Sequence, residues 1–366
     1  MPSRTPDSNR LRRQKDLLRL LESNGVDGLL VSHLPNLFYL TGFSGSAGMG
    51  FFSTRKKVLW VDGRYGLQAR EQSSGVRVIV SRQGILPVVW KFLNQASCRR
   101  VGFESDELYH GDYLRIRART ENSVKLVALE GVVEKLRERK DRKEIALIRR
   151  ACRVTGEVLA EIRDWLRPGI REREVAAEID YRLRRKGAEG VAFETLVASG
   201  PRSALPHGVP SGRRLRKNDL VLIDLGAILE HYCADMTRTL FLGRPDSRTK
   251  RTYKRVLEAQ QRAIEAVRPG VRADQLDRLA RKVLKTSGLD KRFTHSLGHG
   301  LGLEIHETPR LARSVKRSLP EGAVITVEPG VYLPGWGGIR IEDTVLVGKD
   351  GPEVLTPGDK NDWVLG

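Results

Sequence analysis

The chain has 366 residues, of which 40% are hydrophobic and 30% charged, and its formal net charge is +20. A chain of this length can bury a large core and is expected to form two domains. It contains no apolar run close to the ~20 residues that span a bilayer, so a membrane protein is excluded. The positive charge invites a nucleic-acid function, but the basic residues alternate with acidic ones and no recognised nucleic-acid-binding motif is present, so that function is disfavoured.

The cysteines and the N-terminus bear on the compartment. Cys98, Cys152 and Cys233 are odd in number, widely spaced and free of any CxxC pattern. Reduced thiols of a cytosolic protein fit this usage better than a disulfide framework. The first 16 residues are basic but lack the apolar core of a signal peptide. We therefore expect a cytoplasmic protein.

The first third of the chain predicts alternating helices and strands. A helix is expected over 9–23 and another over 86–95, with strands at 28–32, 51–52, 58–61, 76–80 and 101–103. The glycine-rich stretch 41–50 lacks the GK[ST] ending of a P-loop and the spacing of a dinucleotide fingerprint, so tight turns are the better interpretation. This pattern predicts a small α/β domain over residues 1–132.

The remainder, residues 133–366, predicts a second domain with an internal duplication. A charge-dense bridge at 134–144 leads into a helix that stops before Pro168. The stretch 167–187 then aligns without gaps on 268–288, and each copy precedes a histidine-bearing segment and a strand pair. The repetition predicts two halves related by pseudo-two-fold symmetry.

Each half ends in a predicted β-hairpin that carries two acids. In 219–242, a turn near Leu229–Glu230 would place Asp224 opposite Asp235. In 324–347, a turn centred near Gly335 would likewise pair two glutamates, Glu328 and Glu342. Like charges directly opposite each other destabilise a sheet, and a lone acid in an apolar strand is costly to bury. A positive group should therefore lie between these acids.

Three histidines, His295, His299 and His306, lie between the two hairpins. Oxygen-rich donors with one imidazole suit two divalent ions, most of all Mn²⁺, with Co²⁺ or Zn²⁺ possible. Four carboxylates would also balance the charge of two such ions. The alternative, that these acids form surface salt bridges, fits their apolar strands poorly.

At this point the motifs carry a family resemblance. DLG at Asp224, ADMTRT at Asp235, LGHGLGLEIHE at His299, TVEPG at Glu328 and RIED at Glu342 resemble the M24B proline-specific metallopeptidases, the aminopeptidase P and prolidase group. YLTGFSGSAG and VDGRYGLQA look like the N-terminal domain of that group. The resemblance implies a mixed α/β (α+β) protein with a creatinase-like domain at 1–132 and a pita-bread catalytic domain at 133–366.

Carried over residue by residue, the resemblance implies a dinuclear centre. Asp224 would bind one metal ion, and Asp235 and Glu342 would bridge both. His299 and Glu328 would complete the two coordination shells. A metal-bridging hydroxide would attack the scissile carbonyl, and Glu328 would shuttle its proton towards the leaving nitrogen.

The resemblance also implies roles for five residues around the metals. His207 and His306 match histidines that hold the substrate and steady the developing oxyanion. His295 matches a histidine that shapes the substrate pocket. Tyr332 and Arg340 match a pair that steers Asp224 and proton traffic, and Arg340 would also contact substrate.

The function implied is an exopeptidase that hydrolyses the Xaa-Pro bond at the N-terminus of peptides, as a homodimer. We favour aminopeptidase P, which takes longer peptides, over the alternative, Xaa-Pro dipeptidase (prolidase). A non-catalytic pita-bread binding protein and a metal-free creatinase-like amidinohydrolase should both lack ligands that this chain keeps. A methionine aminopeptidase would normally lack the long N-terminal domain.

Overall fold

The computed structural model describes residues 7–365. The chain divides into two compact units between Arg137 and Glu138, which we describe separately as the N-terminal unit and the C-terminal unit. Among the described residues, no helix has both the length and the apolar character needed to cross a membrane.

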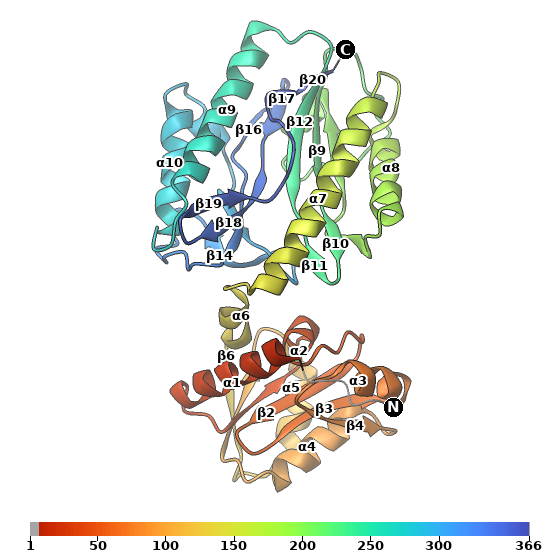
Figure 1. The fold of residues 1–366 in the computed structure, drawn as a ribbon, viewed down its shortest axis with the longest axis vertical. Coiled ribbons are helices and arrows are strands. Elements are labelled where there is room, and N and C mark those ends of the chain that lie inside the picture. Colours follow the sequence, from red (N-terminus) through yellow and green to blue (C-terminus); the bar gives the residue numbers. More distant parts are fainter. Residues whose placement is uncertain (1–6, 366) are drawn as a thin grey trace. The chain divides into compact units, whose positions relative to one another are not determined.

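The N-terminal unit is built on a six-stranded mixed sheet in the order β4-β3-β2-β1-β5-β6 (Figure 1). Its strands are β1 (Gly28–Val31), β2 (Gly48–Ser53), β3 (Lys57–Asp62), β4 (Arg77–Ser81), β5 (Arg100–Glu104) and β6 (Lys125–Leu129). Its helices are α1 (Ser8–Ser23), α2 (Leu34–Thr41), α3 (Gly66–Gln72), α4 (Ile85–Gln95), α5 (His110–Arg119) and α6 (Val132–Arg137), with a short 3₁₀ turn, η1 (Gly63–Tyr65). The predicted strands and the two predicted helices are all present.

The expected bridge at 134–144 is only partly a bridge. Residues 132–137 form α6, because Val132 and Val133 are buried and anchor its first turn. The C-terminal unit's first helix, α7 (Arg142–Trp165), begins at a capping box in which Asp141 accepts from the N–H groups of Lys143 and Glu144. Because the stretch is so rich in charged residues, the sequence did not reveal that one helix ends and another begins within it.

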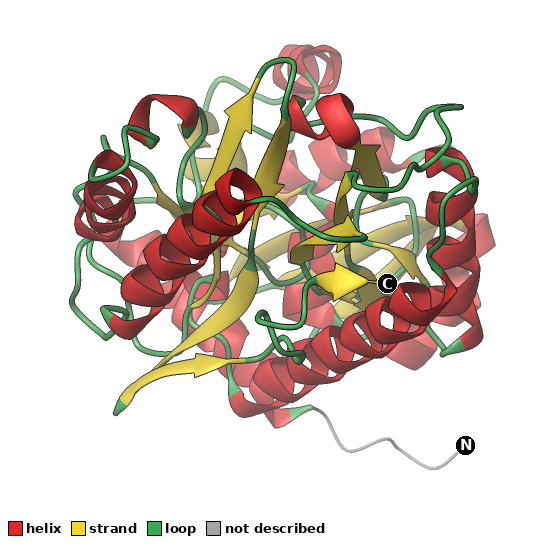
Figure 2. Cartoon of the chain, turned by 90° about the horizontal axis from the view of Figure 1, so that it is seen from above, coloured by secondary structure: helices red, strands yellow, loops and turns green. Residues whose placement is uncertain are grey.

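The C-terminal unit consists of two similar halves. In the first, α7 and α8 (Glu172–Arg185) cover strands β8 (Leu196–Ser199), β9 (Leu220–Leu225) and β12 (Met236–Leu242). In the second, α9 (Ser247–Glu265) and α10 (Ala273–Lys285) cover β15 (Val324–Val327) and β18 (Asp343–Gly348), and β13 (Gly298–Gly300) pairs with β15. The long helices of the unit lie outside its strands (Figures 1 and 2).

Matching hydrogen bonds support the predicted duplication. The N–H of Gly169 donates to Leu215 at 2.8 Å, and that of Gly270, at the equivalent place in the second half, donates to Leu319 at 2.9 Å. The remaining elements are β7 (Gly190–Val191), β10 (Ala227–Leu229), β11 (Tyr232–Cys233), β14 (Glu307–Leu311), β16 (Gly330–Leu333), β17 (Gly337–Arg340), β19 (Gly351–Val354), β20 (Val364–Leu365), η2 (Gly200–Ala204) and η3 (Asp290–Arg292).

The register of the second hairpin is as predicted. Val327 pairs with Asp343 and Gly330 with Arg340, so Glu328 and Glu342 face each other between these pairs. The predicted register of the first hairpin is wrong by two residues. Its turn lies at Glu230–His231, and Asp224 pairs with Thr237 instead of Asp235.

Hydrogen bonds to two backbone carbonyls of the first hairpin join the hairpins to each other. The N–H of Glu342 donates to the carbonyl of Thr237 at 3.1 Å, and the hydroxyl of Thr344 donates to the carbonyl of Asp235 at 2.8 Å. These bonds bring the acidic residues of both hairpins to one junction between the halves.

Candidate metal centre

A cluster of acids and one histidine lies at this junction. Asp235, His299 and Glu342 each offer one donor atom, and these atoms lie within 4.8 Å of one another. The Nε2 atom of His299 lies 3.5 Å from Asp235 Oδ2 and 3.6 Å from Glu328 Oε1. Asp224 lies beside them on β9, close enough for its charge to raise the pKa of Asp235 and Glu328. The structure thus brings all five predicted ligands together.

The donor atoms of this cluster are arranged as a cation requires. Nδ1 of His299 lies 3.0 Å from the carbonyl of Gly300, which can only accept, so Nδ1 carries the proton and the Nε2 lone pair faces two carboxylates. Oδ1 of Asp224 and Oε1 of Glu342 are buried and accept no hydrogen bond from the described residues. Lone pairs that converge without a donor are destabilising unless a cation lies between them, so the residues fit divalent metal ions.

Burial and mutual repulsion perturb the pKa values of the acids. Burial, followed by the charges of Asp224 and Glu328, raises the pKa of Asp235 well above its usual range. Burial and then Asp235 raise the pKa of Glu342 in the same way, and burial raises the pKa of Glu328 to about 8. Burial lowers the pKa of His299 to about 4. Without metal, the cluster therefore retains protons that water-exposed carboxyls would release.

These shifts predict an unusual pH dependence of stability in chelator. The folded protein binds protons that the unfolded chain releases between about 4.5 and about 8, the ordinary and folded pKa values of Glu328, so these acids make stability fall as pH rises. Below about 6.5, the lowered pKa values of His295 and His299 act in the opposite direction. Between about pH 6.5 and about pH 8, the raised pKa values of the acids therefore set how stability changes with pH.

We therefore expect the unfolding free energy in chelator to fall from pH 6.5 to pH 8, by up to about 1.4 kcal/mol per pH unit for each proton released. With Mn²⁺ present it should rise instead, because metal binds the deprotonated ligands. Urea unfolding at four pH values, with and without chelator, measures both slopes. A chelated protein that becomes more stable across this window would contradict the shifts.

Arg340 connects this cluster to its surroundings. Its buried guanidinium pairs with Asp224 Oδ2, donates to the hydroxyl of Tyr332 and the carbonyl of Pro206 at 2.9 Å each, and donates to Thr237 Oγ1 at 3.1 Å. Thr237 in turn donates to Glu342 Oε2 at 2.6 Å. One cation therefore orients two of the predicted ligands.

A hydrogen-bonded chain continues from Tyr332 to His295. The two side chains lie 2.9 Å apart, from the tyrosine oxygen to Nε2, and Nδ1 of His295 donates to the carbonyl of Ser296. Burial lowers the pKa of His295 to about 3, so its ring is neutral and Nε2 accepts from the hydroxyl. Burial raises the pKa of Tyr332 to about 12, which keeps that proton in place. In this series of hydrogen bonds, Arg340 donates to Tyr332, Tyr332 donates to His295, and His295 donates to Ser296.

Three exposed basic residues, His306, His207 and Arg310, lie near the cluster. His306 packs edge-to-face on His299, with ring centroids 4.5 Å apart. Burial, followed by the charge of His207, lowers the pKa of His306, and the Pro206 carbonyl held by Arg340 directly precedes His207. Arg310 is exposed on β14, and its charge also lowers the pKa of both His299 and His306.

Sequence reasoning missed Arg310, as well as Thr237 and Thr326, which lie beside the acids. Arg310 follows His306 by four residues, so its place at the end of the histidine motif was the available signal. The threonines read as ordinary strand residues, and only the junction of the hairpins reveals their contacts with Glu342 and Glu328.

A buried group of acids and one imidazole, at the junction of two similar halves, defines a class of metal-dependent hydrolases. Comparison with known proteins agrees. Residues 146–349 match metallopeptidase family M24, and residues 13–139 match the creatinase/prolidase N-terminal domain. The chain belongs to metallopeptidase family M24, with a creatinase-type N-terminal domain and a pita-bread catalytic domain. The predicted family and fold are confirmed.

Similar proteins cover nearly the whole chain. The Xaa-Pro dipeptidase of Pyrococcus horikoshii is 38% identical over 347 residues, which are 94% of this chain and 97% of that protein. Among solved structures, the Xaa-Pro dipeptidase from Bacillus anthracis has a TM-score of 0.95 at 36% identity, covering 98% of this chain and 100% of that one. The X-Pro aminopeptidase from Thermotoga maritima has a TM-score of 0.87 at 36% identity, covering 95% and 100%.

Proposed function

We propose that the chain is an Xaa-Pro dipeptidase that releases proline from dipeptides. The proteins called Xaa-Pro dipeptidase among its relatives, from Pyrococcus horikoshii and Bacillus anthracis, support this reading better than our expectation of an aminopeptidase P. Aminopeptidase P activity is the second candidate, because the X-Pro aminopeptidase from Thermotoga maritima is also similar to this chain.

Arg310 is the observation that carries the choice of a dipeptide. It is an exposed cation close enough to His299 and His306 to perturb their pKa values, and no carboxylate among residues 7–365 pairs with it. A dipeptide carries its C-terminal carboxylate one residue beyond the scissile bond, whereas a longer peptide has a neutral amide there. A charge-assisted hydrogen bond to Arg310 would therefore favour the dipeptide.

Asp224, Asp235, His299, Glu328 and Glu342 would hold two divalent metal ions, which we propose to be Mn²⁺ because carboxylate oxygens dominate the donor set. Bound ions supply a water-derived nucleophile at neutral pH and polarise the scissile carbonyl. Glu328, whose Oε1 lies 3.6 Å from His299 Nε2, would accept a proton and deliver it to the departing proline nitrogen. Homodimeric assembly and a cytoplasmic location stay predictions.

The histidines and Arg340 would act on the substrate and its surroundings. His306 and His207 lie on the exposed side of the cluster, where they can donate to the carbonyl oxygen as negative charge develops. His295 and Tyr332 would shape the pocket beside them and, with Arg340, hold Asp224 in position. Because the Xaa-Pro bond has no N–H, such a site needs no acceptor for one.

Hydrolysis of Ala-Pro and Ala-Pro-Ala by the Mn²⁺-loaded protein, with a chelated control, tests this function. We expect efficient cleavage of Ala-Pro alone, lost with chelator. Faster cleavage of Ala-Pro-Ala would establish the second candidate. Cleavage of neither peptide by protein that demonstrably holds metal would contradict both.

Arg310→Met tests the basis of the choice. Loss of a charge-assisted contact of about 1.5–3 kcal/mol should lower kcat/KM on Ala-Pro by roughly 10- to 100-fold, mainly through KM. Arg313→Met, at another exposed arginine nearby in the chain, is the matched control and should change little. Equal losses of kcat/KM in the two variants, or an unchanged KM in Arg310→Met, would show that Arg310 does not recognise the substrate.

A further inference from the structure

A second buried polar network lies directly behind Glu342. Its centre is Asp343, which is fully buried and accepts hydrogen bonds from four side chains. The donors are Arg238 at 2.8 Å, Gln260 at 2.7 Å, Thr356 at 2.7 Å and Lys360. The two cations exceed the single carboxylate, so this network places net positive charge behind the acidic cluster.

Arg238 connects the network to the Glu342 backbone. While Nη2 of Arg238 pairs with Asp343, Nη1 donates to the carbonyl oxygens of Glu342 and Thr237. Thr237 is the residue whose hydroxyl donates to the Glu342 carboxylate and whose carbonyl accepts from the Glu342 N–H. Both the N–H and the C=O of Glu342, as well as its side chain, are therefore held by residues of β12.

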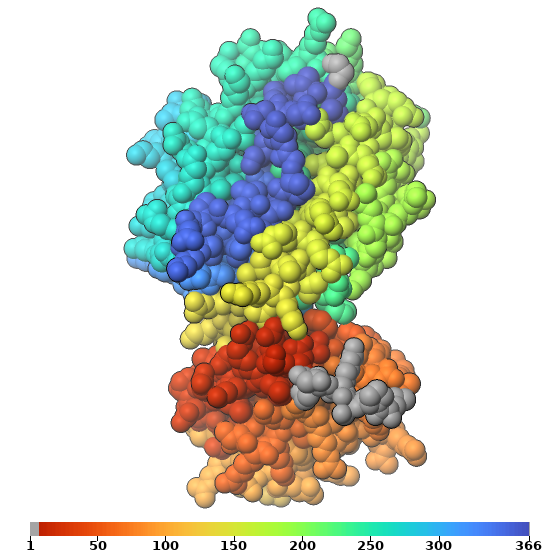
Figure 3. All heavy atoms as spheres, viewed as in Figure 1, coloured from red at the N-terminus to blue at the C-terminus, as the bar shows by residue number. Residues whose placement is uncertain are grey.

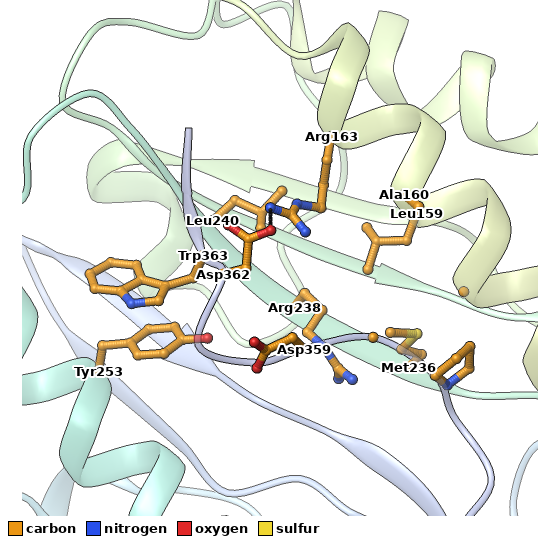
Figure 4. Close-up of a pocket in the computed structure, with 13 residues that line it drawn as sticks. Leu159, Ala160, Arg163, Met236, Arg238, Leu240, Tyr253, Asp359, Asp362 and Trp363 are labelled. Atoms are coloured by element: carbon orange, nitrogen blue, oxygen red, sulfur yellow. Dashed lines mark ion pairs between the residues drawn. The ribbon is translucent and has the colours of Figure 1, made fainter. Parts of the chain in front are cut away.

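Alternation along β12 explains how one strand serves both networks. Thr237 and Thr239 bond to Glu342 and Arg340, whereas Met236, Arg238 and Leu240 line a small pocket of about 50 Å³ on the other face of the strand. In Figure 4, Leu240 lies near Trp363, and Met236 lies at the end of the pocket away from Tyr253. Arg238 thus approaches the Glu342 carbonyl from the side opposite to the acids.

Two of the four donors to Asp343 come from the C-terminal segment, residues 355–365. In Figure 3 this dark-blue segment lies on the surface beside the yellow-green α7. The hydroxyl of Tyr253 donates to the carbonyl of Lys360 at 2.6 Å, and the Tyr253 ring stacks on Trp363 with centroids 4.0 Å apart. β20 then pairs with β12 at Phe241 and Leu242. These contacts hold Thr356 and Lys360 against Asp343.

We propose that Asp343, together with Arg238 and Lys360, positions Glu342 for metal binding, so that the C-terminal segment helps to build the metal centre. This inference rests on the proposed role of Glu342 as a metal ligand. The physical reason is that a carboxylate that would hold metal must present its oxygens at a fixed place. A network that fixes both peptide groups of Glu342 limits the backbone motion that would carry its carboxylate away from the site.

Calorimetric titration of the metal-free full-length protein with Mn²⁺ tests the proposal. Asp343→Asn removes the negative charge and places an amide against two cations. The Mn²⁺ dissociation constant of the site with lower affinity should then rise by about 10- to 100-fold. Lys360→Met removes one donor and should raise it less. Asp362→Asn is the matched control, because Asp362 ties the same segment to Arg163 at 2.6 Å without contacting Asp343 (Figure 4).

Folding is monitored separately by circular dichroism at the titration temperature. A folded Asp343→Asn variant that binds both ions as the wild type does would overturn the proposal. If that variant does not fold, Lys360→Met decides, and wild-type affinity there would overturn it. The readout is metal affinity and not peptide cleavage. A wild-type protein that binds two Mn²⁺ but cleaves no Xaa-Pro peptide would therefore contradict the proposed function, while the role of Asp343 could still be tested. A wild type that binds no Mn²⁺ overturns both.

Discussion

Glu342→Gln should lower kcat/KM on Ala-Pro by at least about 10³-fold, which corresponds to roughly 4 kcal/mol of lost transition-state stabilisation. Glu342 is one of three residues whose donor atoms lie within 4.8 Å of one another, and the charges of Asp235 and Arg340 both act on its pKa. An amide offers one weak donor oxygen where a carboxylate offers two, so the variant should also bind fewer metal ions. Steady-state kinetics and elemental analysis of the purified protein measure both effects.

Stability should respond differently to the same substitution. Burial, followed by the charge of Asp235, raises the pKa of Glu342 well above its usual range, so burial favours the neutral form in chelator, and glutamine resembles that form. The metal-free variant should unfold within about 1 kcal/mol of the wild type. Glu321→Gln, at an exposed glutamate, is the control for activity. Full activity with two ions bound in Glu342→Gln would refute its assignment as a ligand.

Arg340→Met should destabilise the metal-free protein by about 3–5 kcal/mol, the cost of breaking a buried ion pair by removing one partner. The side chains of Arg340 and Asp224 are 4% and 12% exposed. Removal of the cation leaves Asp224 buried beside three other acids and also leaves Thr237, Tyr332 and the Pro206 carbonyl without their donor. Urea unfolding in chelator measures the loss.

An exposed ion pair provides the comparison. Arg149 and Glu353 pair at 2.7 Å with side chains about half exposed, so Arg149→Met should cost no more than about 1 kcal/mol. Comparable losses in the two variants would show that Arg340 contributes no more than a surface charge. Activity of Arg340→Met should also fall, because Asp224 and the Tyr332–His295 chain both lose their orientation.

The turn of each hairpin decided how well its register could be predicted. Gly335 lies at positive φ in a Gly- and Pro-rich turn, which is a strong signal, and the predicted register of that hairpin is correct. The other turn places Glu230 and His231 at φ 47° and 70°, although neither is the glycine or asparagine that such turns prefer. Sequence alone therefore centred that turn one residue too early.

The error left the candidate site intact for a geometric reason. Shifting a strand pair by two residues keeps every side chain on the same face, whereas a shift by one would have reversed it. Asp224 and Asp235 thus remain on one face as diagonal neighbours, and the third and fourth acids join them from the second hairpin. The prediction of a four-acid cluster depended on which face of the hairpin each acid occupies more than on which residue lies opposite it.

The sequence by itself determined the family, the two similar halves, the strand faces and the five candidate ligands, because these depend on local periodicity and on short motifs. Only the tertiary structure decided which residues support them. Asp224 meets Arg340 across 116 positions of the chain, and Arg238 meets Asp343 across 105. Such partners are chosen by how two hairpins pack against each other. That packing is a property of the whole core, which no local pattern of residues records.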